Sequence, residues 1–150
     1  GANLLARLLG DPYFAAPPPK STGREVFHLD WLRSHLRASR LAPADIQATL
    51  VELTARSIAD AVREHAPSAR EVLVCGGGVH NPVLMRAISA ALAPTAVAST
   101  ATCGIDPDYV EAMAFAWLAR ERLLEHAPQN VHSVTGARGA RVLGGIYSGA

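Results

Sequence analysis

The stretch EVLVCGGGVHNPVLM, residues 71–85, places three consecutive glycines between a short apolar run and the start of a helix. The apolar run, Val72–Cys75, is typical of a strand that is buried on both faces in an open α/β sheet. Asn81 is a good helix cap and Pro82 suits the first helical position, so we expect a helix that ends near Leu92. A strand, a glycine turn and a helix in this order indicate an α/β fold.

The segments on either side extend this pattern. Ala96–Ser99 predicts a second short strand. Asp106-Pro107 is expected to open a long helix by the same cap-and-proline device, and Val142–Tyr147 is expected to form a final strand. Upstream, the spacing of leucines and isoleucines predicts helices over residues 3–9, 28–37 and 43–65. Helices therefore lead into the strands, and no internal repeat is visible in the sequence.

The predicted helix over residues 43–65 carries an apolar stripe that should face the core. Its members are Ile46, Leu50, Leu53, Ile58, Ala61 and Val62. The aromatic pair Trp31 and Trp117 is also expected in the core. Near the amino end, Pro17–Pro19 forces an extended path into the polar, basic loop Lys20–Arg24, to which we assign no chemistry.

Composition argues against several classes of partner. The 150 residues carry 14 basic and 13 acidic side chains, which gives no broad attraction to nucleic acid or to anionic lipid. No stretch approaches the ~18 apolar residues of a membrane span. Cys75 and Cys103 form no CxxC pair and suit free thiols in a reducing cytoplasm, although a disulfide between them stays open. We therefore expect a cytoplasmic protein without nucleic-acid or membrane partners.

Glycine runs after a strand have two physical causes. One is a tight turn with positive φ, and the other is close approach of the backbone to a ligand, often a nucleotide, at the carboxyl end of a sheet. The run Gly76–Gly78 matches neither a phosphate loop ending in Gly-Lys-Ser/Thr nor the GxGxxG dinucleotide fingerprint. His80 beside it is more often a loop residue than a ligand. The glycines alone thus support a structural role and a ligand-binding role equally.

Several stretches taken together resemble one family of sugar kinases. The run CGGGVHNPVLM (75–85) is similar to the adenosine-binding segment of sugar kinases in the actin/hexokinase/Hsp70 superfamily. Further matching stretches are DPYF (11–14), PPPKSTGRE (17–25), DWL (30–32), GIDPDYVEAMAFAWLA (104–119) and SVTGA (133–137). With these in the same order, the chain resembles anhydro-N-acetylmuramic acid kinases from about Leu4 to Tyr147.

This resemblance implies a ribonuclease-H-like, two-lobed kinase, of which residues 1–150 match the carboxyl-terminal lobe, helix-rich with a small mixed sheet. Such enzymes use ATP and Mg²⁺ to phosphorylate the 6-oxygen of 1,6-anhydro-N-acetylmuramic acid, and water opens the anhydro ring in the same reaction. The product, N-acetylmuramic acid 6-phosphate, belongs to peptidoglycan recycling. The family's phosphate loop and catalytic aspartate match no segment of this sequence. We therefore expect this chain alone to be inactive. The resemblance also implies a homodimer.

The same resemblance implies the cofactor-binding residues. Gly76, Gly77 and Gly78 would lie against the nucleotide, with His80 and Asn81 nearby. For Asn81 a purely structural reading stands beside this one, because the same residue is the expected helix cap.

Glu111 is the substrate-binding residue that the resemblance implies, because it matches the family's glutamate in D-x-x-E-A-M-A. Asp106 and Asp108 are expected in the first turn of this helix, where they favour the helix dipole, whereas Glu111 is expected past that turn. Glu111 then shares a helix face with Phe115 and Leu118. A carboxylate among such apolar neighbours faces either a cleft or water.

Two other functional classes stay open. One is a non-catalytic nucleotide- or sugar-binding regulatory module of the same superfamily, whose repressors carry a helix-turn-helix domain that is not visible in these residues. The other is a structural or dimerisation domain in which the glycines serve only the turn. Nucleotide titration helps to separate these classes. A phosphate loop and an Asp-Thr-Gly-Pro-Gly-like segment upstream in the parent sequence would indicate the kinase.

Overall fold

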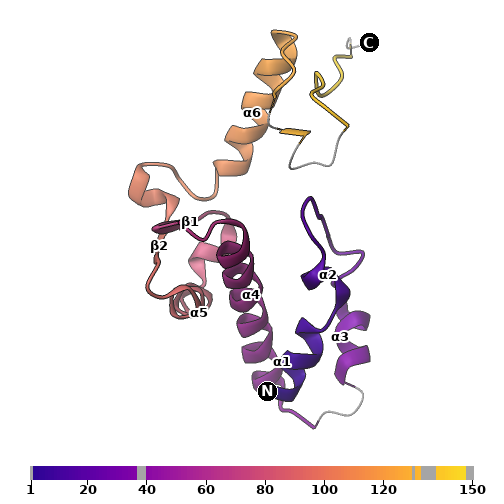
Figure 1. Cartoon of the computed structure of the whole chain (residues 1–150), viewed down its shortest axis with the longest axis vertical. Helices are drawn as coiled ribbons and strands as arrows, with labels where there is room; N and C mark the ends of the chain where they lie inside the picture. Colours follow the sequence, from indigo (N-terminus) through magenta and orange to yellow (C-terminus); the bar gives the residue numbers. More distant parts are fainter. Residues whose placement is uncertain (1, 37–39, 130, 133–137, 148–150) are drawn as a thin grey trace. The chain divides into compact units, whose positions relative to one another are not determined.

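The computed structural model describes residues 2–36, 40–129, 131–132 and 138–147. The chain divides into two compact units, one formed by residues 1–15 and 22–108 and the other by residues 16–21 and 109–150. Figure 1 traces the chain through both units. The matching stretch at Ser133–Ala137 and the predicted helix end at Arg37 lie outside the described residues.

The first unit contains both strands and most of the helices. Its elements in chain order are α1 (Ala2–Leu9), α2 (Pro12–Ala15), α3 (Leu29–Leu36), α4 (Pro43–His65), β1 (Glu71–Val74), the 3-10 helix η1 (Gly77–His80), α5 (Pro82–Leu92), β2 (Ala96–Ser99) and the 3-10 helix η2 (Thr100–Cys103). The helices and strands predicted upstream of Thr100 are thus confirmed. The short α2 is an addition, and it begins with Pro12 at its first position.

The two strands lie in parallel, with Glu71 opposite Ala96 and Val74 opposite Ser99. Parallel neighbours need a crossover connection, and α5 supplies it. Within the described ranges the sheet is two-stranded and purely parallel, so the expected mixed sheet is wrong. The expected strand near the carboxyl end is also wrong, because Gly144 there has a φ of 85°, in the left-handed region that strands do not adopt.

The sheet is covered by helices on one face. Val72 and Val97 pack against a core cluster of buried side chains from α4 and α5, namely Ala55, Ala59, Ile88 and Leu92. Leu73 alternates to the opposite face and is 40% exposed. The expectation of a strand buried on both faces is therefore wrong, since the helices that pack on β1 share one side of it.

Helix α4 takes part in two hydrophobic clusters. The first is the cluster with α5 and the sheet, and the second joins Leu53 to Leu4 and Leu8 of α1, with side chains of α2 and α3 packed around them. Figure 1 shows α1 and α3 on one side of α4 and α5 on the other. Because fully burying a leucine contributes about 1.5–3 kcal/mol, Leu4 and Leu8 hold α1 firmly on α4.

The apolar stripe predicted for α4 is confirmed in part. Its buried or half-buried members are Ile46, Leu50, Leu53, Ile58 and Val62. Ala61 is exposed, and the side that packs on α5 uses Ala55 and Ala59 instead, both fully buried. Two alanines four residues apart leave room for a second helix to approach closely, a feature that the spacing of leucines and isoleucines does not reveal.

The second unit contains α6 (Val110–Leu123). This helix begins at Val110 and not at Asp106-Pro107, because the latter residues form a turn. In that turn Asp106 Oδ1 accepts a hydrogen bond of 3.0 Å from the Asp108 N–H. The predicted helix is therefore confirmed, but its expected start is wrong.

Helix α6 and the residues beside it expose large apolar side chains. The exposed members are Tyr109, Met113, Phe115, Trp117, Leu123 and Leu124. Trp117 is 46% exposed, so its expected core position is wrong, whereas Trp31 packs around the α1–α4 cluster as expected. Within the described residues no helix is both long enough and apolar enough to cross a membrane.

Candidate functional site

The glycine turn directly follows the carboxyl end of β1. Gly76 has a φ of 78° and a ψ of 177°, a conformation that residues with a side chain rarely adopt. Its N–H donates to the Pro107 carbonyl oxygen at 2.8 Å, and its own carbonyl oxygen accepts from the Val79 N–H at 3.1 Å. The backbone itself therefore requires glycine at position 76.

The other two glycines have a different explanation. Neither Gly77 nor Gly78 has a positive φ. A Cβ built on Gly77 would meet no atom within 4 Å, and one built on Gly78 would make an ordinary contact of 3.5 Å with Leu84 Cδ2. Nothing in the described chain thus demands glycine at these two positions. Their bare backbone leaves an open surface that a ligand can approach closely, which favours the second of the two causes of glycine runs.

Asn81 caps α5 as the sequence predicts. Its Oδ1 accepts from the Val83 N–H at 3.0 Å and from the Leu84 N–H at 3.1 Å, with Pro82 in the first helical turn. The side-chain oxygen is thereby committed to the helix. The cap role of Asn81 is confirmed, and its contact with a nucleotide stays a prediction.

His80 ends the 3-10 helix and pairs with a residue that the sequence interpretation gave only a helix-dipole role. Its Nε2 lies 2.9 Å from Oδ1 and 2.8 Å from Oδ2 of Asp108, and both side chains are about half exposed. Because α6 begins later than expected, Asp108 does not sit in the first turn of that helix. The signal that would have found this pair is topological, since the segments after two parallel strands meet at the carboxyl edge of the sheet.

An open cavity of ≈ 680 Å³ lies at this edge. It is lined by Val79, His80, Ser99, Ala101 and the Gly104–Asp108 segment, all within the first unit. Its size falls within the range of small-molecule sites, roughly 300–1,000 Å³. The cavity therefore joins a predicted site residue, His80, to the loop that follows β2.

Glu111 lies in the second unit and is exposed. With α6 beginning at Val110, Glu111 is in the first turn of the helix and not past it, so that expectation is wrong. A carboxylate there favours the helix dipole without any further role. The contact of Glu111 with substrate stays a prediction that carries less structural support than before.

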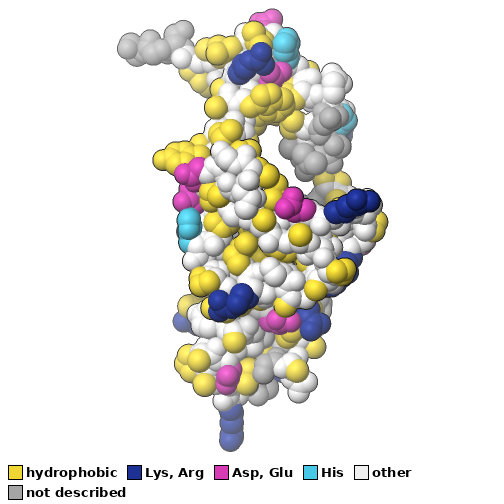
Figure 2. Space-filling view, turned by 90° about the vertical axis from the view of Figure 1, so that its left-hand side faces the viewer, with side chains coloured by type: hydrophobic (Ala, Val, Ile, Leu, Met, Phe, Trp, Pro, Cys, Tyr) yellow, Lys and Arg dark blue, Asp and Glu magenta, His cyan; other side chains and the backbone are white. Residues whose placement is uncertain are grey.

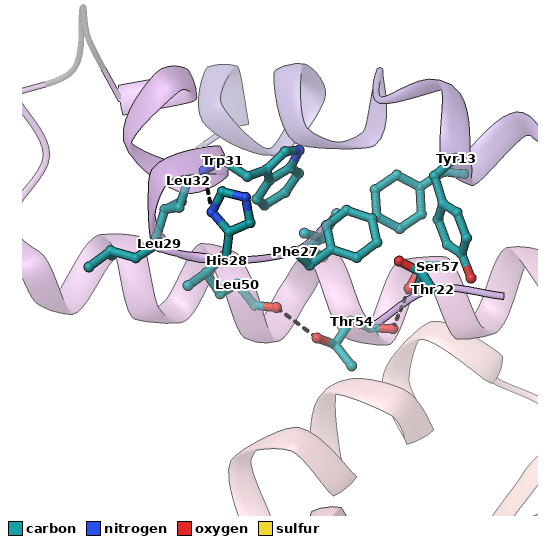
Figure 3. A pocket seen from close by; sticks show the side chains of 12 residues that line it. Tyr13, Thr22, Phe27, His28, Leu29, Trp31, Leu32, Leu50, Thr54 and Ser57 are labelled. Carbon is teal, nitrogen blue, oxygen red and sulfur yellow. Dashed lines mark hydrogen bonds between the residues drawn. The ribbon is translucent and has the colours of Figure 1, made fainter. Parts of the chain in front are cut away.

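A second cavity, of ≈ 570 Å³, has an aromatic wall that the sequence interpretation did not single out (Figure 3). Tyr13 and Trp31 each meet Phe27 edge to face, with ring centroids 5.3 and 4.9 Å apart. Leucines of α3 and α4 also line the cavity. Its lining includes no Lys, Arg, Asp or Glu side chain. Such a surface accepts apolar groups and does not suit a triphosphate.

The aromatic wall is fixed by one carboxylate. Asp11 Oδ1 accepts from the Tyr13 N–H and Asp11 Oδ2 accepts from the Trp31 indole N–H, both at 2.9 Å. These two hydrogen bonds, the backbone one first, hold the pKa of the Asp11 carboxyl below its ordinary value, although burial opposes them. Through these bonds Asp11 of the DPYF stretch connects Tyr13 to Trp31.

Three further features are the state of the cysteines, the arrangement of metal-binding side chains and the surface charge. Cys75 and Cys103 are both free and exposed, so the possible disulfide is absent. In the part of the chain that the structure describes, no group of three or more His, Cys, Asp or Glu side chains is arranged to hold a metal ion. On the face shown in Figure 2, cationic and anionic side chains are interspersed among hydrophobic ones, which agrees with the small net charge.

Comparison with known proteins gives a consistent result. A sequence model of the family described as anhydro-N-acetylmuramic acid kinase matches residues 1–149. Curated proteins of that name from Xanthomonas campestris pv. campestris (strain 8004) and Xanthomonas oryzae pv. oryzae (strain MAFF 311018) are 59% and 60% identical to the chain over 146 residues. One from Pseudomonas syringae pv. syringae (strain B728a) is 55% identical over 145 residues.

These alignments cover nearly all of this chain but much less of each relative. For the two Xanthomonas proteins they include 97% of this chain and 38% of the relative, and for the Pseudomonas protein 96% and 40%. The chain thus spans about two fifths of the length of the curated relatives that it matches.

Proposed function

The chain belongs to the anhydro-N-acetylmuramic acid kinase family, and we propose that it is the carboxyl-terminal lobe of such an enzyme, with the nucleotide bound at the Gly76–Gly78 turn. The complete protein would transfer the γ-phosphoryl of ATP to the 6-oxygen of 1,6-anhydro-N-acetylmuramic acid while water opens the anhydro ring. Its product, N-acetylmuramic acid 6-phosphate, would enter peptidoglycan recycling in the cytoplasm.

The open backbone at Gly77 is the observation that carries the nucleotide assignment. Neither a positive φ nor a close neighbour accounts for glycine there, and the turn lies at the carboxyl end of a parallel strand, where nucleotides bind in α/β proteins. A side chain at this position would fill the space into which a bound nucleoside fits. The residues present therefore suit ATP as the cofactor.

The site residues of this lobe would serve to position the nucleotide and the sugar. Phosphoryl transfer depends mainly on orientation and on electrostatic stabilisation of the transferred group. ATP supplies the phosphoryl group, and Mg²⁺ would be held mainly by its phosphates and by the other lobe. In this lobe the glycine turn would seat the adenosine, and Glu111 would hydrogen-bond the sugar. A phosphate loop and a catalytic aspartate would come from the other lobe, so residues 1–150 alone would be inactive.

Two measurements on the complete gene product test this function. ATP-dependent conversion of 1,6-anhydro-N-acetylmuramic acid is followed by ADP release and by the mass of the product, and the isolated chain should show none. Labelling of the exposed Cys75 thiol, which directly precedes Gly76, is followed by peptide mass spectrometry. ATP should slow the labelling of Cys75 but not the labelling of His65, at the carboxyl end of α4, by a histidine-directed reagent.

Each outcome has a distinct meaning. Protection of Cys75 without turnover would favour the non-catalytic regulatory module. Turnover without protection would move the nucleotide away from the glycine turn. Clear turnover by residues 1–150 alone would contradict the two-lobe assignment.

For the complete protein we also propose a homodimer. Light scattering measures its mass directly.

A further inference from the structure

The contact between His80 and Asp108 joins the two segments that follow the parallel strands. Building on the proposed function, we infer that Asp108 is a positioning residue of the nucleotide site: it orients the His80 ring so that the other ring nitrogen meets the nucleoside end of ATP. The resemblance to known kinases assigns no such role to Asp108, and its position in the sequence indicated only an interaction with the helix dipole.

The geometry of the imidazole supports this role. Both short contacts, 2.8 and 2.9 Å, run from one ring nitrogen, Nε2, to the two oxygens of the Asp108 carboxylate. A proton on Nε2 therefore points at Asp108, and a hydrogen bond at one ring nitrogen fixes which nitrogen is left for a ligand. Within the described residues, the hydrogen bonds of the His80 side chain all run through Nε2. Nδ1 is the nitrogen that remains to face a bound group.

The backbone of the carboxylate-bearing segment is itself held in place. Asp106 Oδ1 accepts from the Asp108 N–H at 3.0 Å, and the Pro107 carbonyl oxygen accepts from the Gly76 N–H at 2.8 Å. The Gly76–Pro107 bond and the His80–Asp108 contact thus attach both ends of η1 to the same segment. Three consecutive glycines have a large conformational entropy to lose, so two attachment points reduce the cost of ordering the turn when a nucleotide binds.

The charge of the cavity indicates which end of the nucleotide it receives. Two carboxylates, Asp106 and Asp108, line it, and its lining includes no Lys or Arg side chain. A triphosphate would be repelled here, whereas ribose hydroxyls and base nitrogens form hydrogen bonds with carboxylate and imidazole groups. The nucleoside end therefore fits this cavity, with the phosphates directed away from it.

A double-mutant cycle on the complete gene product tests the inference. His80→Ala removes the ligand contact and should raise the Kd and KM for ATP about tenfold, with little change in kcat. Asp108→Ala leaves the ring but frees its orientation, and because the pair is half exposed the expected rise is about three- to fivefold. The double variant should match His80→Ala alone, since Asp108 acts through His80.

Conservative and control variants separate positioning from general damage. Asp108→Asn keeps an oxygen that accepts from Nε2–H and should stay within about twofold of the wild-type KM for ATP. His65→Ala removes an exposed histidine beside Glu64 at the end of α4 and should leave all constants unchanged. Thermal unfolding of each variant verifies that the fold is intact.

Three results would overturn this role for Asp108. They are additive effects of the two alanine substitutions, an Asp108→Ala enzyme with the wild-type KM for ATP, and a fall in kcat with KM unchanged. Failure of the wild-type protein to bind ATP or to turn over would instead overturn the proposed function, and the inference with it. The wild-type assay therefore distinguishes the two failures.

Discussion

The segment from β1 to α5 buries part of its apolar side chains in the cluster with α4, whereas α6 leaves most of its own exposed. In the first segment Ile88 and Leu92 are almost completely buried, and Asn81 fixes where the helix begins. In α6 Phe115 is 63% exposed, and the N-cap residue Tyr109 makes no side-chain capping bond. An apolar helix sequence therefore does not by itself determine which element the helix packs on.

The largest expected effect tests this contrast directly. Ile88→Ala should lower the free energy of unfolding by about 2–5 kcal/mol, because it leaves a cavity between α4, α5 and the sheet. Phe115→Ala in the same chain should change it by no more than about 0.5 kcal/mol, because most of that side chain is already exposed. Urea unfolding of both variants measures the difference. Similar losses for the two variants would contradict the difference in burial between α5 and α6.

The same Phe115 variant can also be measured in the complete gene product. If α6 packs on the other lobe in the complete gene product, Phe115→Ala should cost more stability there than in the isolated 150 residues. Burying a phenylalanine side chain contributes about 1.5–3 kcal/mol, which sets the scale of the expected increase. The same urea experiment on both proteins tests it, and equal costs would argue that α6 stays exposed in the complete protein.

The glycine turn provides the next effect in size. Gly76→Ala should destabilise the chain by about 1–3 kcal/mol, because its backbone conformation is nearly restricted to glycine. Gly77→Ala should leave stability almost unchanged, because a Cβ there meets open space, yet it should weaken ATP binding in the complete gene product. Thermal unfolding and ATP titration separate the two roles. A large loss of stability from Gly77→Ala would make that glycine structural.

The helix cap contributes a smaller effect. Asn81→Ala should cost about 1 kcal/mol, because the first N–H groups of α5 lose the side-chain oxygen that accepts from them. Asn81→Asp is the matched control and should retain most of the stability, since aspartate caps equally well. If the alanine variant is as stable as the wild type, the cap is not important for the β1–α5 segment.

The smallest effect lies outside both segments and depends on pH. The lowered pKa of Asp11 means that its ionised form stabilises the folded chain at pH values above the pKa of the unfolded state. This contribution should be lost as pH falls through the lower, folded-state pKa. The difference in Tm between the wild type and Asp11→Asn should therefore shrink on acidification. A difference that is constant between about pH 7 and pH 3 would contradict the assignment.

The sequence predicted those features that local chemistry determines. The Asn81-Pro82 start of α5, the limits of α4 and both strands follow from caps, prolines and short-range apolar spacing. The start of α6 did not follow from these signals, because Asp106-Pro107 resembles a helix start but is held in a turn. Whether Leu73 and Trp117 are buried depends on which elements pack on them, and a pattern along one chain does not contain that information.

The features of the candidate site also differ in whether the sequence predicts them. The position of the glycine turn was accessible from the sequence, since it needs only a strand, three glycines and a helix cap. The partner of His80 could not be predicted from the sequence. Asp108 lies in a different segment, and the parallel pairing of β1 and β2 brings it to His80. Non-local contacts of this kind depend on topology, which spacing alone does not fix.

The membership of α4 in two hydrophobic clusters affects how the first unit unfolds. This 23-residue helix, about 35 Å long, gives Ala55 and Ala59 to one hydrophobic cluster and Leu53 to the other. Neither cluster can lose α4 while the other keeps it intact. Amide hydrogens of α4 should therefore exchange only through an opening that disrupts both clusters, with a free energy at least as high as that for α1 or α5.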